Sequence, residues 1–402
     1  MPTSPLRIAI IGCGTAGPAS AVLLRRQGHE VVLFERAEAC KAVGAGFLLQ
    51  PSGMGVLREL GILEEVMAHA ARVERLHVLD EKGATLLDLR YREIGEEKFG
   101  AGLHRPVLLH HLIEAMRLAD VDVRWGWEIA QVARHGKSWE VESTTGQRCG
   151  GFDLLIIADG ARSVLRDLAG TGGVNRGYAW GAHWFIGTND AVFPEDELYQ
   201  VVHGTRKLGG FLATGRDLNG GSPLVSLFWS LRIADDAAWR ARPLQEWKDE
   251  ILELCPRAVG LLGQITSWDQ VLTARYGDVR MRRWHADGVV VLGDAAHAMS
   301  PQLGQGVNLA LADASCLAEC LAEFPLPAAL RTYQRRRWFA LRYYQLATRW
   351  LTPWFQSDYE RLTPLRHLFF GLTRRLPWAR RFMTLTMAGL VGFREAGRRG
   401  QK

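Results

Sequence analysis

A glycine-rich turn between an apolar strand and a helix constrains the fold more than any other part of the sequence. Residues 6–11 are apolar and β-prone, and the turn 12–17 that follows has glycine at its first, third and sixth positions. A helix is predicted over 18–27, and a second strand over 31–34 leads directly into Glu35. This order of strand, glycine turn, helix and strand-end acid predicts a βαβ unit that binds a dinucleotide.

Each glycine of the turn has a separate physical task. Gly12 permits the tight turn, Gly14 lets the backbone approach a pyrophosphate, and Gly17 lets the helix pack closely on the strands. The N-terminus of the helix that follows has free N–H groups and the positive end of the helix dipole, which favour phosphate binding, and Thr15 and Ala16 of the turn are further candidate cofactor residues.

Glu35 follows the second strand, 23 residues after Gly12. A carboxylate at this place accepts hydrogen bonds from both ribose hydroxyls of a dinucleotide. Its negative charge would repel a 2′-phosphate, so NADP is not the ligand expected at this turn. The alternative is that Glu35 is only a surface acid at the end of a strand.

A second ligand-binding segment lies about 280 residues further along the chain. Residues 288–294 are predicted to form a buried strand that runs into Asp294, and a helix is predicted to start near Val307. The ends of buried parallel strands bind ligands, and the first N–H groups of a helix face negative groups. The candidate cofactor residues of this segment are Gly293, Asp294, Pro301, Gly304, Gln305, Gly306, Val307 and Asn308. With the first turn, they indicate FAD held by two distant pieces of one domain.

Residues 293–314, GDAAHAMSPQLGQGVNLALADA, resemble the second FAD motif of the single-component (class A) FAD-dependent aromatic monooxygenases. This family includes para-hydroxybenzoate hydroxylase and the ubiquinone-pathway hydroxylases. The segment 153–166, with Asp159 and Gly160, resembles the family's Asp-Gly motif, which borders FAD and is implicated in nicotinamide binding.

Three further matches extend the resemblance over roughly residues 6–350. Arg105 matches the family arginine that contacts the phosphate and ribityl region of the flavin, and Arg36 falls where the family places a side chain against adenine. The segment 44–51, which includes Gly46, matches the loop that lines the mobile flavin.

The resemblance implies an α/β fold with a Rossmann-like FAD-binding domain of the glutathione-reductase type. An antiparallel-sheet substrate domain is inserted into it, and a basic helical segment follows at the C-terminus. Strand-like patterns at 178–186, 207–214 and 224–231 and a helical segment at 243–263 agree with the insertion. The predicted FAD-binding domain covers 1–75, 100–177 and 275–350, the substrate domain covers 76–99 and 178–274, and the C-terminal segment covers 351–402.

The substrate pocket is less well specified. His183, Trp184, Phe211 and Trp229 are pocket candidates, although for any one of them packing of the sheet against a helix is the better-supported interpretation. Pro301, Gly304 and Gly306 are the candidates nearest to the flavin ring, and no acid–base residue is identified.

The chemistry implied by the resemblance starts with transient binding of NADPH or NADH, which reduces FAD. Oxygen then adds at the flavin C4a position, and the hydroperoxide transfers one oxygen atom to an electron-rich aromatic or quinone-like molecule. The turn 304–308 would stabilise negative charge on the flavin with its backbone N–H groups.

Three other functions stay open at this point: a reductase or dehydrogenase of the same fold, a flavin-dependent halogenase, and a flavin-carrying redox sensor without turnover. The halogenase alternative is weakened by the segment 125–130, Trp-Gly-Trp-Glu-Ile-Ala, which lacks the proline of the halogenase Trp-x-Trp-x-Ile-Pro run.

The basic charge belongs to the C-terminal end of the chain. The net charge is +6, but nine lysines and arginines against one acid give residues 366–402 a charge of +8. A nucleic-acid partner is therefore not expected. The basic amphipathic tail indicates either contact with an anionic membrane surface or a capping or dimer-forming segment. The six scattered cysteines lack metal-ligand spacing, and no leader or spanning segment is recognised, so a cytoplasmic enzyme without a metal is expected.

Overall fold

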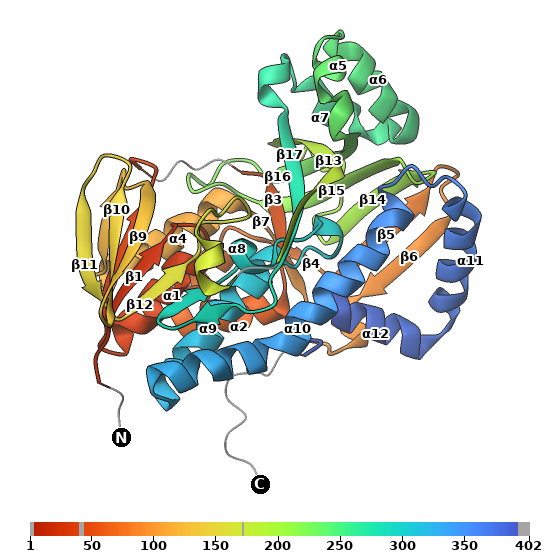
Figure 1. Cartoon of the computed structure of the whole chain (residues 1–402). Coiled ribbons are helices and arrows are strands. Elements are labelled where there is room, and N and C mark those ends of the chain that lie inside the picture. Colours follow the sequence, from red (N-terminus) through yellow and green to blue (C-terminus); the bar gives the residue numbers. More distant parts are fainter. Residues whose placement is uncertain (1–3, 40–43, 171–172, 393–402) are drawn as a thin grey trace.

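The predicted βαβ unit lies within the mostly parallel sheet in the computed structural model, which describes residues 4–39, 44–170 and 173–392 (Figure 1). It consists of β1 (Arg7–Ile11), α1 (Ala16–Arg26) and β2 (Glu30–Glu35). Strand β1 pairs in parallel with β2 on one side and with β12 (Leu154–Ile157) on the other. Ile8, Ala9 and Ile10 are fully buried, as a central parallel strand covered on both faces requires.

The sheet has six strands in the order β18-β19-β12-β1-β2-β8, and all neighbouring pairs are parallel except β18 with β19. Its remaining strands are β8 (Asp122–Trp125), β18 (His285–Ala286) and β19 (Val289–Val291). Helix α1 packs against α9 (Gly306–Glu323) and α4 (Arg105–Leu118). Since the parallel strands share one direction, the turns after β1, β2, β12 and β19 meet at one edge. This arrangement confirms the predicted α/β fold class.

Two small antiparallel sheets flank the parallel sheet. One has the order β11-β10-β9 and the other the order β3-β7-β4. Their strands are β9 (Ile129–His135), β10 (Ser138–Ser143), β11 (Arg148–Phe152), β3 (Gly46–Leu49), β4 (Ala71–Val73) and β7 (Gly100–His104). Helices α2 (Pro51–Leu60) and α3 (Leu63–Met67) follow β3 in the chain, and α2 packs against α9. Helix α8 (Asp294–His297) follows β19.

The inserted region forms a seven-stranded sheet in the order β17-β13-β16-β15-β14-β5-β6, in which only β14 and β5 pair in parallel. The strands are β5 (Arg75–Asp80), β6 (Thr85–Arg90), β13 (Val174–Thr188), β14 (Glu197–His203), β15 (Lys207–Gly215), β16 (Leu224–Arg232) and β17 (Leu272–Arg280). Segments around 75–90 and 174–280 thus share one sheet, which agrees with the predicted substrate domain. Its exact boundaries stay a prediction.

One face of this sheet is covered by α5 (Asp236–Arg240), α6 (Leu244–Leu254) and α7 (Val259–Gly263), seen at the top of Figure 1. The helical segment predicted over 243–263 is interrupted at Pro256, which has no N–H for the helical hydrogen bond. The short 3-10 helices are η1 (Tyr91–Glu93), η2 (Arg166–Ala169), η3 (Ile233–Asp235), η4 (Pro256–Ala258), η5 (Trp268–Gln270) and η6 (Pro301–Leu303).

The C-terminal segment packs on the body of the protein. Helix α10 (Leu326–Phe355) continues five residues beyond the predicted domain end at 350, and α11 (Leu362–Arg375) and α12 (Pro377–Met387) follow it. Both later helices contact β6, as the right side of Figure 1 shows. The ring of Phe370 is buried against Phe355, with 5.6 Å between the ring centroids. The capping role predicted as one alternative for the tail is therefore present.

Helix α11 gives a direct test of this packing. Phe370→Ala removes a ring that is 2% exposed and should lower the free energy of unfolding by about 3–5 kcal/mol. Leu368→Ala lies on the same helix at a residue that is 60% exposed and should change it by about 0.5 kcal/mol or less. Thermal and denaturant unfolding measure both effects. Equal destabilisation by the two changes would contradict the packing of this helix.

Candidate cofactor and substrate site

The glycines of the first turn occupy three different environments. A Cβ on Gly12 would lie 2.5 Å from the carbonyl oxygen of Ala158, and a Cβ on Gly17 would lie 2.0 Å from the carbonyl oxygen of Gly12. Gly12 also has a φ of +105°, which only glycine adopts readily. In contrast, a Cβ on Gly14 would meet no heavy atom within 4 Å. Gly12 and Gly17 are thus required by packing, while Gly14 borders open space.

The carboxylate of Glu35 is held in place by the same turn. Its Oε2 accepts a hydrogen bond from the backbone N–H of Cys13 at 2.7 Å, and its Oε1 accepts one from that of Ala37 at 3.0 Å. Both oxygens keep further lone pairs, so the oriented carboxylate can still accept hydroxyl donors. Arg36 is exposed beside it, and Thr15 and Ala16 start helix α1 above the turn.

The turns after β12 and β19 adjoin the first turn. Gly12 lies against Ala158 and Asp159, and a Cβ on Gly293 would lie 3.4 Å from the Cβ of Ala16. The carboxyl oxygen Oδ1 of Asp159 is buried and has no hydrogen-bond partner within the described ranges. Burial raises the pKa of this carboxyl, opposed by a hydrogen bond from Ser163 and by nearby arginines. An unpartnered buried acceptor of this kind points to a ligand that supplies a donor.

Arg166 explains how this turn keeps its shape. Its Nε donates to the carbonyl oxygen of Ser163 at 3.0 Å, and its Nη2 donates to that of Ala161. Gly160 has a φ of +87°, and a Cβ there would meet no atom within 4 Å. Gly160 therefore presents backbone to open space next to Asp159.

Arg105 is the first residue of α4 and lies directly after β7. The guanidinium group is surrounded by protein yet accessible to solvent, and it lies close enough to Asp294 for the two charges to interact. A Cβ on Gly44 would come within 2.6 Å of the Cδ of Arg105, so the loop before β3 passes closely over this side chain. Residues 40–43 of the loop lie outside the described ranges.

Asp294 and the start of α9 lie at the edge of the parallel sheet where the strands end, in the segment that follows β19. Asp294 is exposed at the first position of α8, and a Cβ on Gly306 would lie 3.8 Å from its Oδ1. Gly306 and Val307 form the first turn of α9, whose N–H groups lack helical partners. Pro301 opens η6, and Gly304 follows it with a φ of +62° and open space around it.

Two predicted cofactor residues in this segment use their side chains for structure. The Oδ1 of Asn308 accepts the N–H of Gln50 at 2.8 Å, and its Nδ2 donates to the carbonyl oxygens of Leu48 and Gly304. Gln305 is buried and donates to the carbonyl oxygen of Met387 at 2.6 Å, which connects the turn to the end of α12. Any contact of these two residues with a cofactor is therefore expected through their backbone.

A buried network of charged side chains holds the turn after β19 in place. Asp313 of α9 is fully buried, with its Oδ2 2.5 Å from Nε2 of His297 and 3.0 Å from the N–H of Gly293. Its Oδ1 accepts a hydrogen bond from Nε of Arg337 in α10 at 2.7 Å. Burial alone would raise the pKa of Asp313, but the charges of His297 and Arg337 and these hydrogen bonds outweigh burial and lower it to about 2.

The pocket candidates on the seven-stranded sheet divide between its two faces. His183, Phe211 and Trp229 all point to the face covered by α5–α7, where Phe211 is 0% and Trp229 is 2% exposed. His183 packs between Trp247 and Trp268, with its Nε2 3.1 Å from Oδ1 of Asp236. This placement supports the alternative interpretation, that these side chains pack the sheet against helices, because none of them reaches open space.

We give the name cofactor edge to the edge where the turns after β1, β2, β12 and β19 meet, since it carries most of the predicted cofactor residues. The opposite face of the seven-stranded sheet approaches this edge through β3. Gly46 of β3 donates its N–H to Oγ of Ser226 in β16 at 3.3 Å, and a Cβ on Gly46 would lie 2.3 Å from the side chain of Thr214. On the same face as Ser226, Phe228 packs against Trp184 with 5.4 Å between ring centroids. The indole N–H of Trp184 donates to the hydroxyl of Tyr276 at 3.2 Å. We call Trp184, Phe228 and Tyr276 the aromatic wall; each is partly accessible to solvent.

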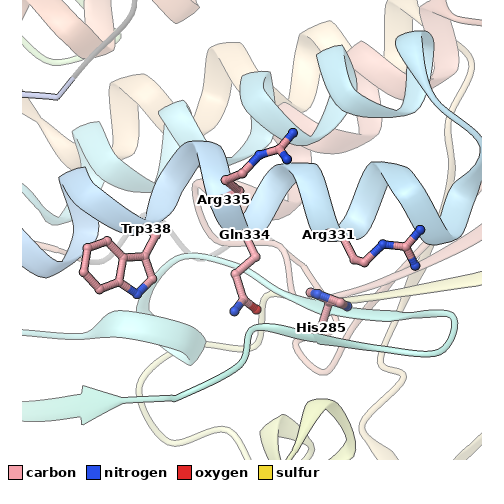
Figure 2. Close-up of a pocket in the computed structure, with 5 residues that line it drawn as sticks. All are labelled: His285, Arg331, Gln334, Arg335 and Trp338. Atoms are coloured by element: carbon pink, nitrogen blue, oxygen red, sulfur yellow. The ribbon is translucent and has the colours of Figure 1, made fainter.

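Figure 2 shows a groove elsewhere on the molecule, with a volume of about 400 Å³. It is lined by His285, Arg331, Gln334, Arg335 and Trp338, four of which lie on the outer side of α10. None of the predicted cofactor residues lines it.

Comparison with known proteins agrees with this geometry. Residues 6–342 match the model of a family described as the FAD binding domain. The chain is also 30% identical over 344 residues to 3-amino-4-hydroxybenzoate 2-monooxygenase of Streptomyces cremeus, with 83% of each chain covered. The chain belongs to the FAD-dependent monooxygenase family. A putative FAD-dependent monooxygenase of Bacillus subtilis, YetM, is 26% identical over 82% of this chain and 88% of its own.

Solved structures share the fold. Pseudomonas aeruginosa PqsL in complex with 2-aminobenzoylacetate has a TM-score of 0.79 at 24% identity, covering 92% of this chain and all of its own. Klebsiella pneumoniae HpxO with FAD and uric acid has a TM-score of 0.80 at 21% identity, covering 94% and 97%. The predicted recognition, fold class and FAD cofactor are confirmed.

The residues at the cofactor edge fit FAD. The open space at Gly14 suits a pyrophosphate, the oriented carboxylate of Glu35 suits a ribose, and the unpartnered Oδ1 of Asp159 suits a hydroxyl or ring donor. The individual contacts remain a proposal.

The sequence alone assigned no role to Arg337, Ser226 or Tyr276. Nothing in a single sequence marks which arginine of a helix is buried or which face of a strand lies towards the proposed flavin site.

The glycine environments predict a contrast between two variants. Gly14→Ala should leave the unfolding temperature of the FAD-free protein unchanged but weaken FAD binding about tenfold or more, roughly 1.4 kcal/mol, because the added methyl projects into the pyrophosphate space. Gly17→Ala should destabilise the protein even without FAD, because its Cβ overlaps the Gly12 carbonyl. Quenching of flavin fluorescence and thermal unfolding separate the two effects. Unchanged FAD affinity in Gly14→Ala would refute the placement.

The Asp313 network predicts a pH dependence of stability. Since the folded pKa is about 2 against an ordinary value of 3.8, the carboxylate contributes about 2.5 kcal/mol above pH ~4, and this contribution is lost as the pH falls towards 2. Asp313→Asn should therefore be less stable than the unmodified protein at neutral pH, and the difference should shrink in acid. Asp249→Asn, at an exposed site, is the control. A difference that is constant between neutral pH and pH 2 would contradict the network's charge state.

Proposed function

We propose that this FAD-dependent monooxygenase hydroxylates an electron-rich aromatic or quinone-like small molecule, with NADPH or NADH as the transient reductant. The observation that carries the proposal is the aromatic wall, because its partly accessible rings occupy the sheet face that contacts the cofactor edge through Ser226 and Gly46. Flat apolar rings bind a flat ring by burial and by offset or edge contacts.

The named relatives act on molecules of this kind. The Streptomyces cremeus relative is a 3-amino-4-hydroxybenzoate 2-monooxygenase, and a Rhodococcus erythropolis relative is named a probable 2-heptyl-3-hydroxy-4(1H)-quinolone synthase. The two solved structures hold 2-aminobenzoylacetate and uric acid. These ligands are aromatic or planar, which supports the same substrate class for this chain.

When bound and reduced, FAD would activate molecular oxygen, so that one oxygen atom enters the substrate and the other leaves as water. The residues of the chain then have three proposed tasks. The aromatic wall orients the substrate ring and excludes water, which protects the oxygenating flavin from unproductive discharge. The backbone N–H groups at the start of α9, around Gly304 and Gly306, stabilise negative charge on the flavin. Arg105 and Asp294 hold the central part of the cofactor.

The proposed acid–base chemistry involves no side chain identified so far. Burial raises the pKa of the Tyr276 phenol, so this group stays protonated and acts as a hydrogen-bond donor or acceptor rather than as a base.

A screen of phenols, quinolones and quinone precursors tests the activity. A substrate should stimulate NADPH or NADH oxidation and oxygen uptake, and the product should gain the mass of one oxygen atom. Stimulated oxidation without oxygen in any product would favour the reductase alternative.

Two neighbouring residues of β16 test the face assignment. Phe228→Ala should raise KM about tenfold and increase hydrogen peroxide released per NAD(P)H consumed, because it opens the aromatic wall. Trp229→Phe changes the next residue, on the face covered by α6 and α7, and should leave KM and coupling unchanged. Steady-state kinetics with peroxide detection measure both. If only the Trp229 variant altered KM, the pocket would lie on the other side of the sheet.

A further inference from the structure

Helix α11 is apolar on the side that faces away from the protein. Its inner side buries Phe370 against Phe355. Its outer side presents Leu365, Leu368 and Leu372, which are all more than half exposed. These residues recur every three or four positions and so form one stripe on the helix. A leucine stripe in contact with water is unfavourable and is expected to be covered in the working protein.

The neighbouring helices extend this stripe. The ring of Phe339 in α10 contacts Tyr343, which contacts Phe382 in α12, and Trp350 in α10 contacts Phe369 in α11 at 5.3 Å between centroids. These ring contacts bring α10 against both α11 and α12, and all three helices carry exposed apolar side chains. We define the C-terminal apolar face by these residues: Phe339, Leu346, Trp350, Leu365, Leu368, Leu372, Trp378 and Phe382.

Arginines surround the C-terminal apolar face. Arg361, Arg374, Arg375 and Arg381 are exposed on or beside α11 and α12. Residues 326–392 contain twelve arginines and two acids, Asp358 and Glu360. Two of these arginines are buried and three others pair with acids of other elements, so the positive surface charge rests mainly on the exposed arginines. The groove of Figure 2 adds two further arginines of α10, Arg331 and Arg335. The expected partner is therefore apolar at its centre and negatively charged at its surface.

We propose that the C-terminal apolar face binds the surface of an anionic lipid bilayer. Exposed leucines and tryptophans enter the boundary between headgroups and acyl chains, while arginines contact lipid phosphates. No helix within residues 4–39, 44–170 and 173–392 is long and apolar enough to cross a bilayer, so the contact lies in the plane of the surface. A second copy of the chain fits less well, because two such arginine-rich faces would repel each other.

Sedimentation of the FAD-loaded enzyme with vesicles tests the proposal. The protein should co-sediment with vesicles of phosphatidylcholine mixed with phosphatidylglycerol, bind vesicles of phosphatidylcholine alone much more weakly, and lose binding as salt increases. Equal or absent binding to the two kinds of vesicle at low salt would overturn the proposal.

Matched variants locate the binding face. The double change Leu368→Glu with Leu372→Glu should abolish sedimentation with the anionic vesicles, and Arg375→Gln with Arg381→Gln should weaken it, by about fivefold for each arginine. Leu118→Glu changes a leucine of α4 that is 76% exposed outside the C-terminal apolar face and should have no effect. The unfolding temperature and the vesicle-free rate of NAD(P)H oxidation should be the same in all variants, which shows that the fold is kept.

Light scattering without vesicles tests the alternative, in which a second copy of the chain covers the C-terminal apolar face. A monomer is expected for the unmodified protein and the variants. A dimer that the two glutamate changes dissociate would overturn the proposal in favour of a second copy. The result does not depend on the substrate screen, so failure of either proposal leaves the other testable.

Discussion

The carboxylate of Asp313 joins three parts of the chain around the proposed flavin half of the site. It binds His297 and the N–H of Gly293 in the loop after β19, and it binds Arg337 in α10. Removing one member would leave a buried charge without a partner, which typically costs several kcal/mol. The position of Asp294, one residue after Gly293, thus depends on this buried network. The proposed contact of Asp294 with FAD would rest on an interaction in the core.

Neighbouring residues on the strands of the seven-stranded sheet face opposite sides of the sheet, and the two sides have different surroundings. Trp229 and Phe211 pack on the side of α6 and α7, whereas Phe228 and Trp184 lie on the opposite face, which we propose faces the cofactor. Because side chains alternate along a strand, neighbouring residues of one strand would serve stability and the proposed substrate contact separately. Under this proposal, substitutions of Phe228 or Trp184 would change substrate preference with little effect on the helical layer behind the sheet.

The sequence predicted the parts of the structure that rest on backbone geometry. Gly12, Gly17 and the acids after the strands follow from the close approaches and turns that a βαβ unit requires, and the structure places them together at one edge. The strand alternation around His183 and Trp184 was visible, but it could not say which face of the sheet would lie towards the proposed flavin site. In the structure, the face that carries Ser226 contacts Gly46, across 180 residues of chain. Likewise, Arg335, Arg336 and Arg337 look equivalent in sequence, and only packing shows that Arg337 is the buried one.

The bond from Gln305 to Met387 has a consequence for how the enzyme is made. The turn proposed to bind the adenosine end of FAD lies within residues 12–35, but Gln305, in the turn proposed to lie beside the flavin, donates a hydrogen bond to Met387 near the end of the chain. Chains emerge N-terminus first and fold in that order. If these assignments hold, the proposed flavin turn gains this hydrogen bond only after synthesis is nearly finished, later than the proposed adenosine turn forms.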